Sequence, residues 1–151
     1  AGMGLALACD VRVMSRRAFF MSAFINVGLI PDSGSSWFLP AMVGVSRAME
    51  IAMSGRRVDA DESHRLGLIA AVSEPEALVD DAVRMARGFA DGPTVAFRAT
   101  RKILHAAAGS SLQAILDEEA RVQGELGSLP THAEGMAAFA EKRSPDFRAL
   151  P

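Results

Sequence analysis

The chain has 151 residues, of which 50% are hydrophobic, with 16 basic and 18 acidic side chains and a net charge of −2. This apolar content is enough for a buried core, so a globular chain is expected. No block of like charges is long enough to follow a phosphate backbone, which argues against nucleic acid as a partner. Charged residues and glycines interrupt the apolar runs before they reach the roughly 20 residues of a membrane span, so no spanning helix is expected.

The first part of the chain predicts strands mixed with short helices. Residues 5–14 are apolar, and charged residues alternate with β-branched valines near their end, a pattern that predicts a buried strand. Residues 18–30 predict a further strand or a tight turn, and residues 68–73 predict a short strand.

Two short helices are expected between these strands. Ser46 is a candidate N-cap for the first, which Gly55 would end. Asp59 and Glu62 have the spacing of a capping box, and Gly67 would end that second helix.

The pattern becomes helical from Pro75 onward. Thr131 and Glu134 again have capping-box spacing. We therefore divide the chain into an α/β region, 1–73, and a helical region, 74–151. The expected helices lie within 75–90, 93–108, 111–126 and 131–143.

Cysteine and histidine provide no sign of a metal site. Cys9 is the single cysteine, and its apolar surroundings predict a buried thiol in a reducing compartment, which favours a cytoplasmic location. His64, His105 and His132 are dispersed and lack metal-ligand spacing. No metal is expected.

Residues 28–36, GLIPDSGSS, place one carboxylate, Asp32, after an apolar run and a proline. Aspartate at this position can cap the helix that follows. A single carboxylate beside apolar residues can also move a proton. The residues themselves leave both roles open.

Three segments carry a resemblance to a known family: AGMGLALACDVRVMSRRAFF, the stretch from GLIPDSGSSWFLP through GLIAAV, and EGMAAFAEKRSPDF near the end. Together they resemble the enoyl-CoA hydratase/isomerase, or crotonase, superfamily. MSAFINVGLIPDSGSSWFLP and AEKRSPDF are most similar to ring-epoxide isomerases that act on epoxidised phenylacetyl-CoA. The resemblance implies the later part of a longer protein, without the earlier strands.

The resemblance implies an α/β fold: a truncated crotonase-like spiral of strand-strand-helix units, with a helical C-terminal trimerisation region. It also implies a homotrimer or homohexamer and an acyl-CoA thioester substrate. Coenzyme A is then part of the substrate, and no separate cofactor is expected.

The same resemblance assigns candidate roles near the start of the chain. The backbone at Ala1 matches one donor of the oxyanion hole that stabilises a thioester enolate, and Gly2 would allow close approach of the substrate. Hydratases of the family use two glutamates, but these positions hold Gly4 and Phe24. Other members place an aspartate where Asp32 stands, which makes Asp32 the candidate catalytic residue.

Further positions are matched to the substrate. Phe24 and Trp37 are candidates for the acyl pocket, with core packing as the alternative, and for Phe38 packing is favoured. Lys142 matches a position near the CoA nucleotide, with a solvated lysine as the alternative.

The resemblance and the single carboxylate favour an acyl-CoA isomerase that shuttles one proton through Asp32, in phenylacetyl-CoA or fatty acid catabolism. Two other crotonase reactions stay open: hydration, and displacement of a halide from an aryl-CoA with Asp32 as the nucleophile. A noncatalytic acyl-CoA-binding or assembly subunit is the third alternative.

Overall fold

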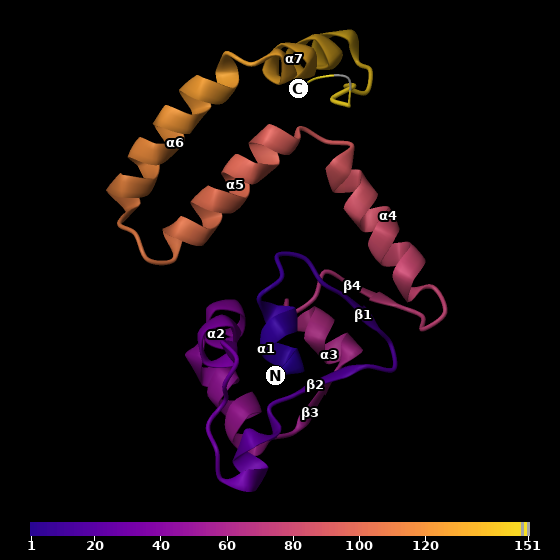
Figure 1. The fold of residues 1–151 in the computed structure, drawn as a ribbon, viewed down its shortest axis with the longest axis vertical. Helices are drawn as coiled ribbons and strands as arrows, with labels where there is room; N and C mark the ends of the chain where they lie inside the picture. Colours follow the sequence, from indigo (N-terminus) through magenta and orange to yellow (C-terminus); the bar gives the residue numbers. More distant parts are fainter. Residues whose placement is uncertain (149, 151) are drawn as a thin grey trace. The chain divides into compact units, whose positions relative to one another are not determined.

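A computed structural model describes residues 1–148 and 150 of the chain (Figure 1). These residues form two compact units, Ala1–Val83 and Arg84–Pro151, and each is considered by itself. The units are defined by packing alone, so the division after residue 73 stays a prediction.

The first unit mixes short strands with helices. Its elements in chain order are α1 (Gly2–Leu7), β1 (Val13–Ser15), β2 (Phe19–Met21), the 3-10 helix η1 (Ala23–Val27), α2 (Ser35–Ser54), β3 (Arg57–Asp59), α3 (Ala60–Arg65) and β4 (Ala71–Ser73).

The strands form two small two-stranded sheets. β1 and β4 are parallel, with Val13 opposite Ala71, whereas β2 and β3 are antiparallel, with Phe20 opposite Val58. Because parallel partners need a long connection, the segment between β1 and β4 contains most of the other elements of this unit.

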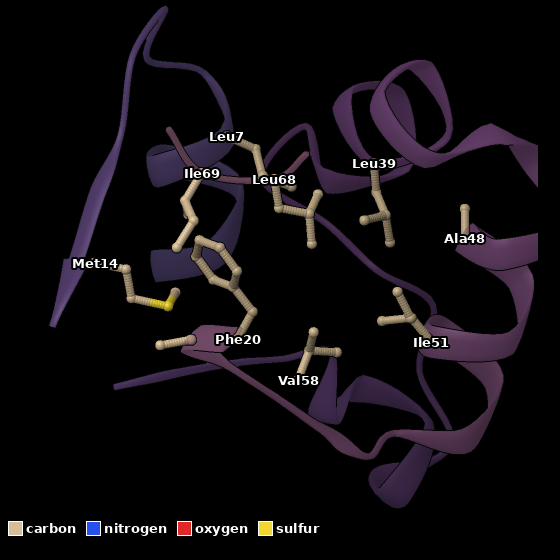
Figure 2. Packing of buried hydrophobic residues seen from close by; sticks show 10 residues of the cluster. Leu7, Met14, Phe20, Leu39, Ala48, Ile51, Val58, Leu68 and Ile69 are labelled. Atoms are coloured by element: carbon tan, nitrogen blue, oxygen red, sulfur yellow. The ribbon is translucent and has the colours of Figure 1, made fainter. Parts of the chain in front are cut away.

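The core of the first unit lies between these sheets and α1, α2 and α3. Figure 2 shows side chains from α1, α2, β1, β2 and β3 and from residues 68–69 converging, with Phe20, Val58 and Leu68 near the centre of the cluster. Ile51, Val58 and Leu68 are fully buried. Burial of this apolar surface is the main stabilising contribution within the unit.

The strand predicted over residues 5–14 is wrong for most of its length. Gly2–Leu7 is helical, and strand pairing begins only at Val13. Met3, Ala6 and Leu7 have i, i+3, i+4 spacing and all contact the core, so helical periodicity explains their burial. Residues 18–30 agree better with the prediction, since they contain β2 and η1.

The helix expected over residues 46–54 is the second part of α2. α2 as a whole begins at Ser35, and its second part begins after Gly44, close to the predicted start at Ser46. Gly44, with φ 76° and ψ 157°, interrupts the helical backbone, and Gly55 ends the helix in the left-handed region, as predicted. Pro40 lies inside α2 and lacks an N–H for the Ser36 carbonyl.

The cap predicted at Asp59 is confirmed. Its carboxylate accepts a hydrogen bond from the Glu62 N–H at 2.8 Å. Gly67, with φ 74°, follows the helix as expected. The Glu62 side chain bonds Arg56 instead of completing the capping box.

All four helices predicted after Pro75 are present: α4 (Leu78–Ala90), α5 (Thr94–Ala107), α6 (Leu112–Gly127) and α7 (Pro130–Glu141). α5 and α6 pack together as a hairpin, and α6 contacts α7 (Figure 1). α7 begins one residue before Thr131, because Pro130 occupies the first helical position. Thr131 is therefore not the N-cap, and that prediction is wrong.

The second unit buries little of its apolar surface. Among its described residues, the buried apolar side chains are Val122 and Ala138. Leu104, Leu112 and Phe139 are 67%, 75% and 83% exposed. These helices thus leave much of their apolar surface exposed.

Cys9 is exposed, which contradicts the buried thiol expected from the sequence. It follows the end of α1 in a turn, and its thiol donates to the Leu5 carbonyl oxygen. Among the described residues, no helix combines the length and apolar character needed to cross a membrane.

Candidate functional site

The start of α1 and the loop that carries Asp32 meet backbone to backbone. Gly4 is buried, and a Cβ atom built on it would lie 2.2 Å from the Ser33 carbonyl oxygen. Only a hydrogen atom fits at that distance, so glycine at position 4 allows α1 to approach the loop. Ala1, the N-cap, and Gly2 precede this contact within the same turn of α1.

The loop reaches α2 through two consecutive residues in the left-handed region. Ser33 has φ 53° and Gly34 has φ 81°. Gly34 accommodates this conformation readily, whereas Ser33 pays a conformational cost. Strained non-glycine residues of this kind cluster at functional sites, which supports a functional role for the loop.

The Asp32 carboxylate does not cap α2. The N-cap is Gly34 without a side-chain cap bond, and the Ser35 N–H donates to the main-chain carbonyl of Asp32 at 2.9 Å. The carboxylate instead accepts the Ser33 hydroxyl at 2.8 Å, and the residue is exposed. The capping alternative is therefore wrong, and no helix end depends on this carboxylate.

Apolar side chains flank the carboxylate along the chain. Ile30 is 81% exposed and Trp37 is 68% exposed. Phe24 lies half-buried in η1, and its carbonyl accepts the Leu29 N–H at the start of the segment leading to Asp32. Trp37 thus presents apolar surface rather than filling the core, while Phe38 packs against the core as expected.

Lys142 lies in the second unit, at the C-terminal cap of α7. It adopts the left-handed region, with φ 54° and ψ 37°, and is exposed. The structure therefore brings α1 and the Asp32 loop into contact at Gly4, while Lys142 belongs to the second unit.

Ser33 was missed by sequence reasoning. Its hydroxyl is the hydrogen-bond partner of the candidate carboxylate, and its carbonyl defines the space at Gly4. The sequence offers no signal for it beyond its position after Asp32.

The Arg56 guanidinium forms the main electrostatic cluster of the first unit. It donates to both carboxylate oxygens of Glu50 and both of Glu62, over 2.6 to 2.9 Å. Hydrogen bonding to Arg56 lowers the pKa of Glu50 to about 2 and also lowers the pKa of Glu62. This cluster ties α2 to α3 and has the character of a structural ion pair.

A metal site finds no support in the part of the chain that the structure describes. No group of three or more His, Cys, Asp or Glu side chains there could hold a metal ion. The chemistry available at the Asp32 loop is that of one carboxylate beside exposed apolar surface and a helix start.

Comparison with known proteins identifies the family. The family described as Enoyl-CoA hydratase/isomerase matches residues 1–149. The chain belongs to the enoyl-CoA hydratase/isomerase family.

Relatives within the enoyl-CoA hydratase/isomerase family carry different activities in their names. A Rhodobacter capsulatus protein named "Probable enoyl-CoA hydratase" is 45% identical over 97% of the chain and 57% of its own length. The 1,2-epoxyphenylacetyl-CoA isomerase of Escherichia coli K12 is 38% identical over 97% of the chain and 56% of its own length. The chain therefore spans little more than half the length of these relatives.

Solved structures of the family share the fold. A crystal structure of an enoyl-CoA hydratase/isomerase from Cupriavidus metallidurans CH34 has a TM-score of 0.90 and 35% identity, covering 99% of the chain and 57% of that structure. An enoyl-CoA hydratase subunit from Geobacillus kaustophilus HTA426 has a TM-score of 0.91 and 34% identity, covering 97% and 57%. The fold is thus the crotonase fold, represented over part of its length, as the resemblance predicted.

Proposed function

We propose that this chain supplies the catalytic carboxylate of an acyl-CoA isomerase. One observation carries the proposal. The 2.2 Å approach of the Ser33 carbonyl to a Cβ built on Gly4 leaves no room for a side chain at position 4, and the same loop carries Asp32. The site is thus arranged around one carboxylate, which suits proton removal and return by a single group.

In the proposed reaction, the thioester carbonyl accepts a hydrogen bond from the main-chain N–H at Ala1, with a second donor elsewhere in the protein. The Asp32 carboxylate removes a proton from carbon, the electron pair moves to the thioester oxygen as an enolate, and the oxyanion donors stabilise that charge. Asp32 then returns the proton to a different carbon. Gly2 allows close approach, and Phe24 and Trp37 contact the acyl group.

The acyl group is proposed to be unsaturated or aromatic. Exposed apolar surface at Ile30 and Trp37 flanks the carboxylate in sequence, and a flat apolar wall suits a ring or a conjugated chain. The Escherichia coli relative named for 1,2-epoxyphenylacetyl-CoA isomerisation supports phenylacetyl-CoA catabolism, and fatty acid catabolism is the second possibility.

Hydration is the second candidate function. The Rhodobacter capsulatus relative, at 45% identity, bears a hydratase name. Addition of water needs one group to activate the water and another to protonate carbon. Gly4 and Phe24 stand at the two positions that the family resemblance assigns to these groups, so isomerisation is favoured.

The proposal extends to binding and assembly. Lys142 is proposed to bind the CoA nucleotide, and the protein to be a cytoplasmic homotrimer or homohexamer. The exposed apolar side chains of the second unit, such as Leu104 and Leu112, support association with further copies. Sedimentation of the whole protein that the gene encodes, here called the gene-encoded protein, tests this. A monomer at micromolar concentration would contradict it.

The function is tested by Asp32→Asn in the gene-encoded protein. We expect kcat for enoyl-CoA isomerisation to fall by about 10²-fold or more, because an amide cannot accept and return the proton. Acyl-CoA binding and thermal stability should be retained, since the carboxylate makes no cap bond. The measurement pairs isomerisation kinetics with a binding titration and a thermal melt.

Ser36→Ala is the matched control. Ser36 lies in the first turn of α2, just after the loop, and its hydroxyl donates to the Pro31 carbonyl, so its removal should change kcat by no more than a few-fold. If Asp32→Asn keeps kcat within a few-fold of the parent, the carboxylate is not the base. If neither the parent nor the Ser36→Ala variant exchanges the α-proton of any acyl-CoA with deuterium, the chain belongs to a noncatalytic binder.

A further inference from the structure

The turn that follows α7 has an unusual conformation for the residue it contains. Lys142 adopts the left-handed region at the helix C-terminus, a position that glycine fills at lower cost. A lysine at this position therefore lowers the stability of the backbone relative to glycine. The ammonium group of Lys142 makes no hydrogen bond or ion pair with any residue that the structure describes, so no internal contact accounts for that cost.

A bidentate ion pair spans this turn. The Arg143 guanidinium donates to the two carboxylate oxygens of Glu134 at 2.6 and 3.0 Å. Glu134 lies on α7, nine residues before Arg143 and on the other side of Lys142 in the chain. The pair therefore closes the turn across the residue that is strained.

Glu134 also holds the segment beyond the turn. One of its carboxylate oxygens accepts the Asp146 N–H at 2.8 Å, so helix, turn and following segment meet at a single side chain. Glu134 is 20% exposed, which shields these hydrogen bonds from water more than an ordinary surface pair. Hydrogen bonds from Arg143 and from the Asp146 N–H lower the pKa of Glu134 to about 2, so it stays ionised at neutral pH.

Arg143 forms a second ion pair, which is more exposed to solvent. The Nε atom donates to Glu141 at 2.6 Å, but Glu141 is 62% exposed. Glu141 has no hydrogen bond to the segment beyond the turn among the bonds of the described residues. Glu141 therefore pairs with the same arginine as Glu134 but does not connect α7 to the segment beyond the turn.

We propose that Glu134 and Arg143 are positioning residues for nucleotide binding: they fix the turn so that the Lys142 ammonium is held ready for a phosphate of the CoA nucleotide. This rests on the proposed function, in which Lys142 binds that nucleotide. A lysine is a flexible point charge, so fixing its backbone reduces the entropy lost when a phosphate is bound.

The test measures how much the nucleotide contributes to binding. The gene-encoded protein is titrated calorimetrically with coenzyme A and with pantetheine, which lacks the nucleotide. The measured quantity, the Kd ratio, is the Kd for pantetheine divided by the Kd for coenzyme A. Glu134→Gln should reduce this ratio by about three- to ten-fold, the size of effect of one ordinary hydrogen bond. Pantetheine affinity should stay unchanged, which general unfolding would not allow.

Glu141→Gln is the matched control. It removes the other carboxylate on Arg143, and the Kd ratio should stay within about two-fold of the parent. Should Glu134→Gln fold poorly, Arg143→Lys keeps the charge but cannot reach both oxygens of Glu134 with a fork, and we expect the same reduced ratio. An unchanged ratio in a folded Glu134 or Arg143 variant overturns the proposal.

Lys142→Gly separates this proposal from the function on which it rests. Glycine should raise thermal stability, because it relieves the left-handed backbone, while the Kd ratio falls. If the ratio is unchanged in Lys142→Gly, Lys142 does not bind the nucleotide, and the binding site fails together with the positioning role. If the ratio falls in Lys142→Gly but not in Glu134→Gln, the binding site stands and the positioning role is wrong.

Discussion

Glycine at position 4 has a specific steric cause. The family resemblance assigns a close approach, that of the substrate, to Gly2, and no steric reason for Gly4 is evident from the sequence alone. The structure separates the two residues: a Cβ on Gly4 would meet the Ser33 carbonyl oxygen at 2.2 Å, whereas a Cβ on Gly2 would meet nothing within 4 Å. A backbone oxygen cannot move aside as a side chain can, so the requirement at Gly4 is strict.

Gly4→Ala should destabilise the protein by about 1–3 kcal/mol, because α1 or the Asp32 loop must shift to admit the methyl group. Gly2→Ala is the control. It lies in the same helix with open space around it, so alanine should be neutral or stabilising by up to about 1 kcal/mol. Urea unfolding of both variants measures the difference. Equal stabilities would show that the loop yields without cost.

The site could be predicted from sequence only in part. Asp32 was singled out as a lone carboxylate, and its exposure in a loop at the start of α2 is compatible with a chemical role. Its hydrogen bond to Ser33 joins neighbouring residues, but the packing of that loop against Gly4 is a contact between residues 29 positions apart. No local pattern encodes such a contact.

At the scale of whole elements, helices with strong local signals were predicted well. α4, α5 and α6 have apolar residues at helical spacing between Gly, Ser or Pro signals, and they form where expected. α1 was mistaken for a strand because a short apolar run suits either element, and packing against the core decides between them. A helix was expected directly after Asp32 and another over residues 46–54; α2 contains both, and the non-helical backbone at Gly44 separates them.

The two capping boxes in the sequence give opposite expectations for stability. Asp59→Ala should cost about 0.5–2 kcal/mol, because it removes the acceptor of the Glu62 N–H at the start of α3. Thr131→Ala should change stability by less than about 0.5 kcal/mol, because Thr131 lies inside α7 and caps nothing. Denaturant unfolding under identical conditions compares them. A larger loss of stability in Thr131→Ala than in Asp59→Ala would show that Thr131 caps α7, as the sequence suggested.

For the molecule as a whole, acid should be a source of instability. Arg56 lowers the pKa of Glu50 from 4.5 to about 2, and Arg143 does the same for Glu134. A carboxylate with a lowered folded pKa contributes stability that is fully present above the unfolded value and lost as pH falls through the folded value. The melting temperature should therefore decrease as pH falls from about 4.5 to about 2.

Glu50→Gln should flatten that decrease, since one of the titrating groups is removed. Salt should have a similar effect on the wild-type protein, because Glu50 is 41% exposed and its pair with Arg56 is partly screened. Thermal melts at several pH values measure both. A melting temperature that is level between pH 4.5 and pH 2 would show that these ion pairs contribute nothing to folding stability.

The last prediction concerns the reaction that the whole protein prefers. We expect the gene-encoded protein to hydrate crotonyl-CoA poorly, because hydration needs a base for water and an acid for carbon, and the matched positions hold Gly4 and Phe24. Neither side chain can transfer a proton. The steric limit at Gly4 also means that Gly4→Glu should not restore hydration, since the carbonyl of Ser33 occupies the space that a side chain would need. The measurement follows the loss of enoyl absorbance, with isomerisation of a 3-enoyl-CoA by the same preparation as the control for active protein. Hydration with kcat near or above roughly 10² per second would contradict the prediction, because so fast a reaction requires a second proton-transfer group beyond Asp32.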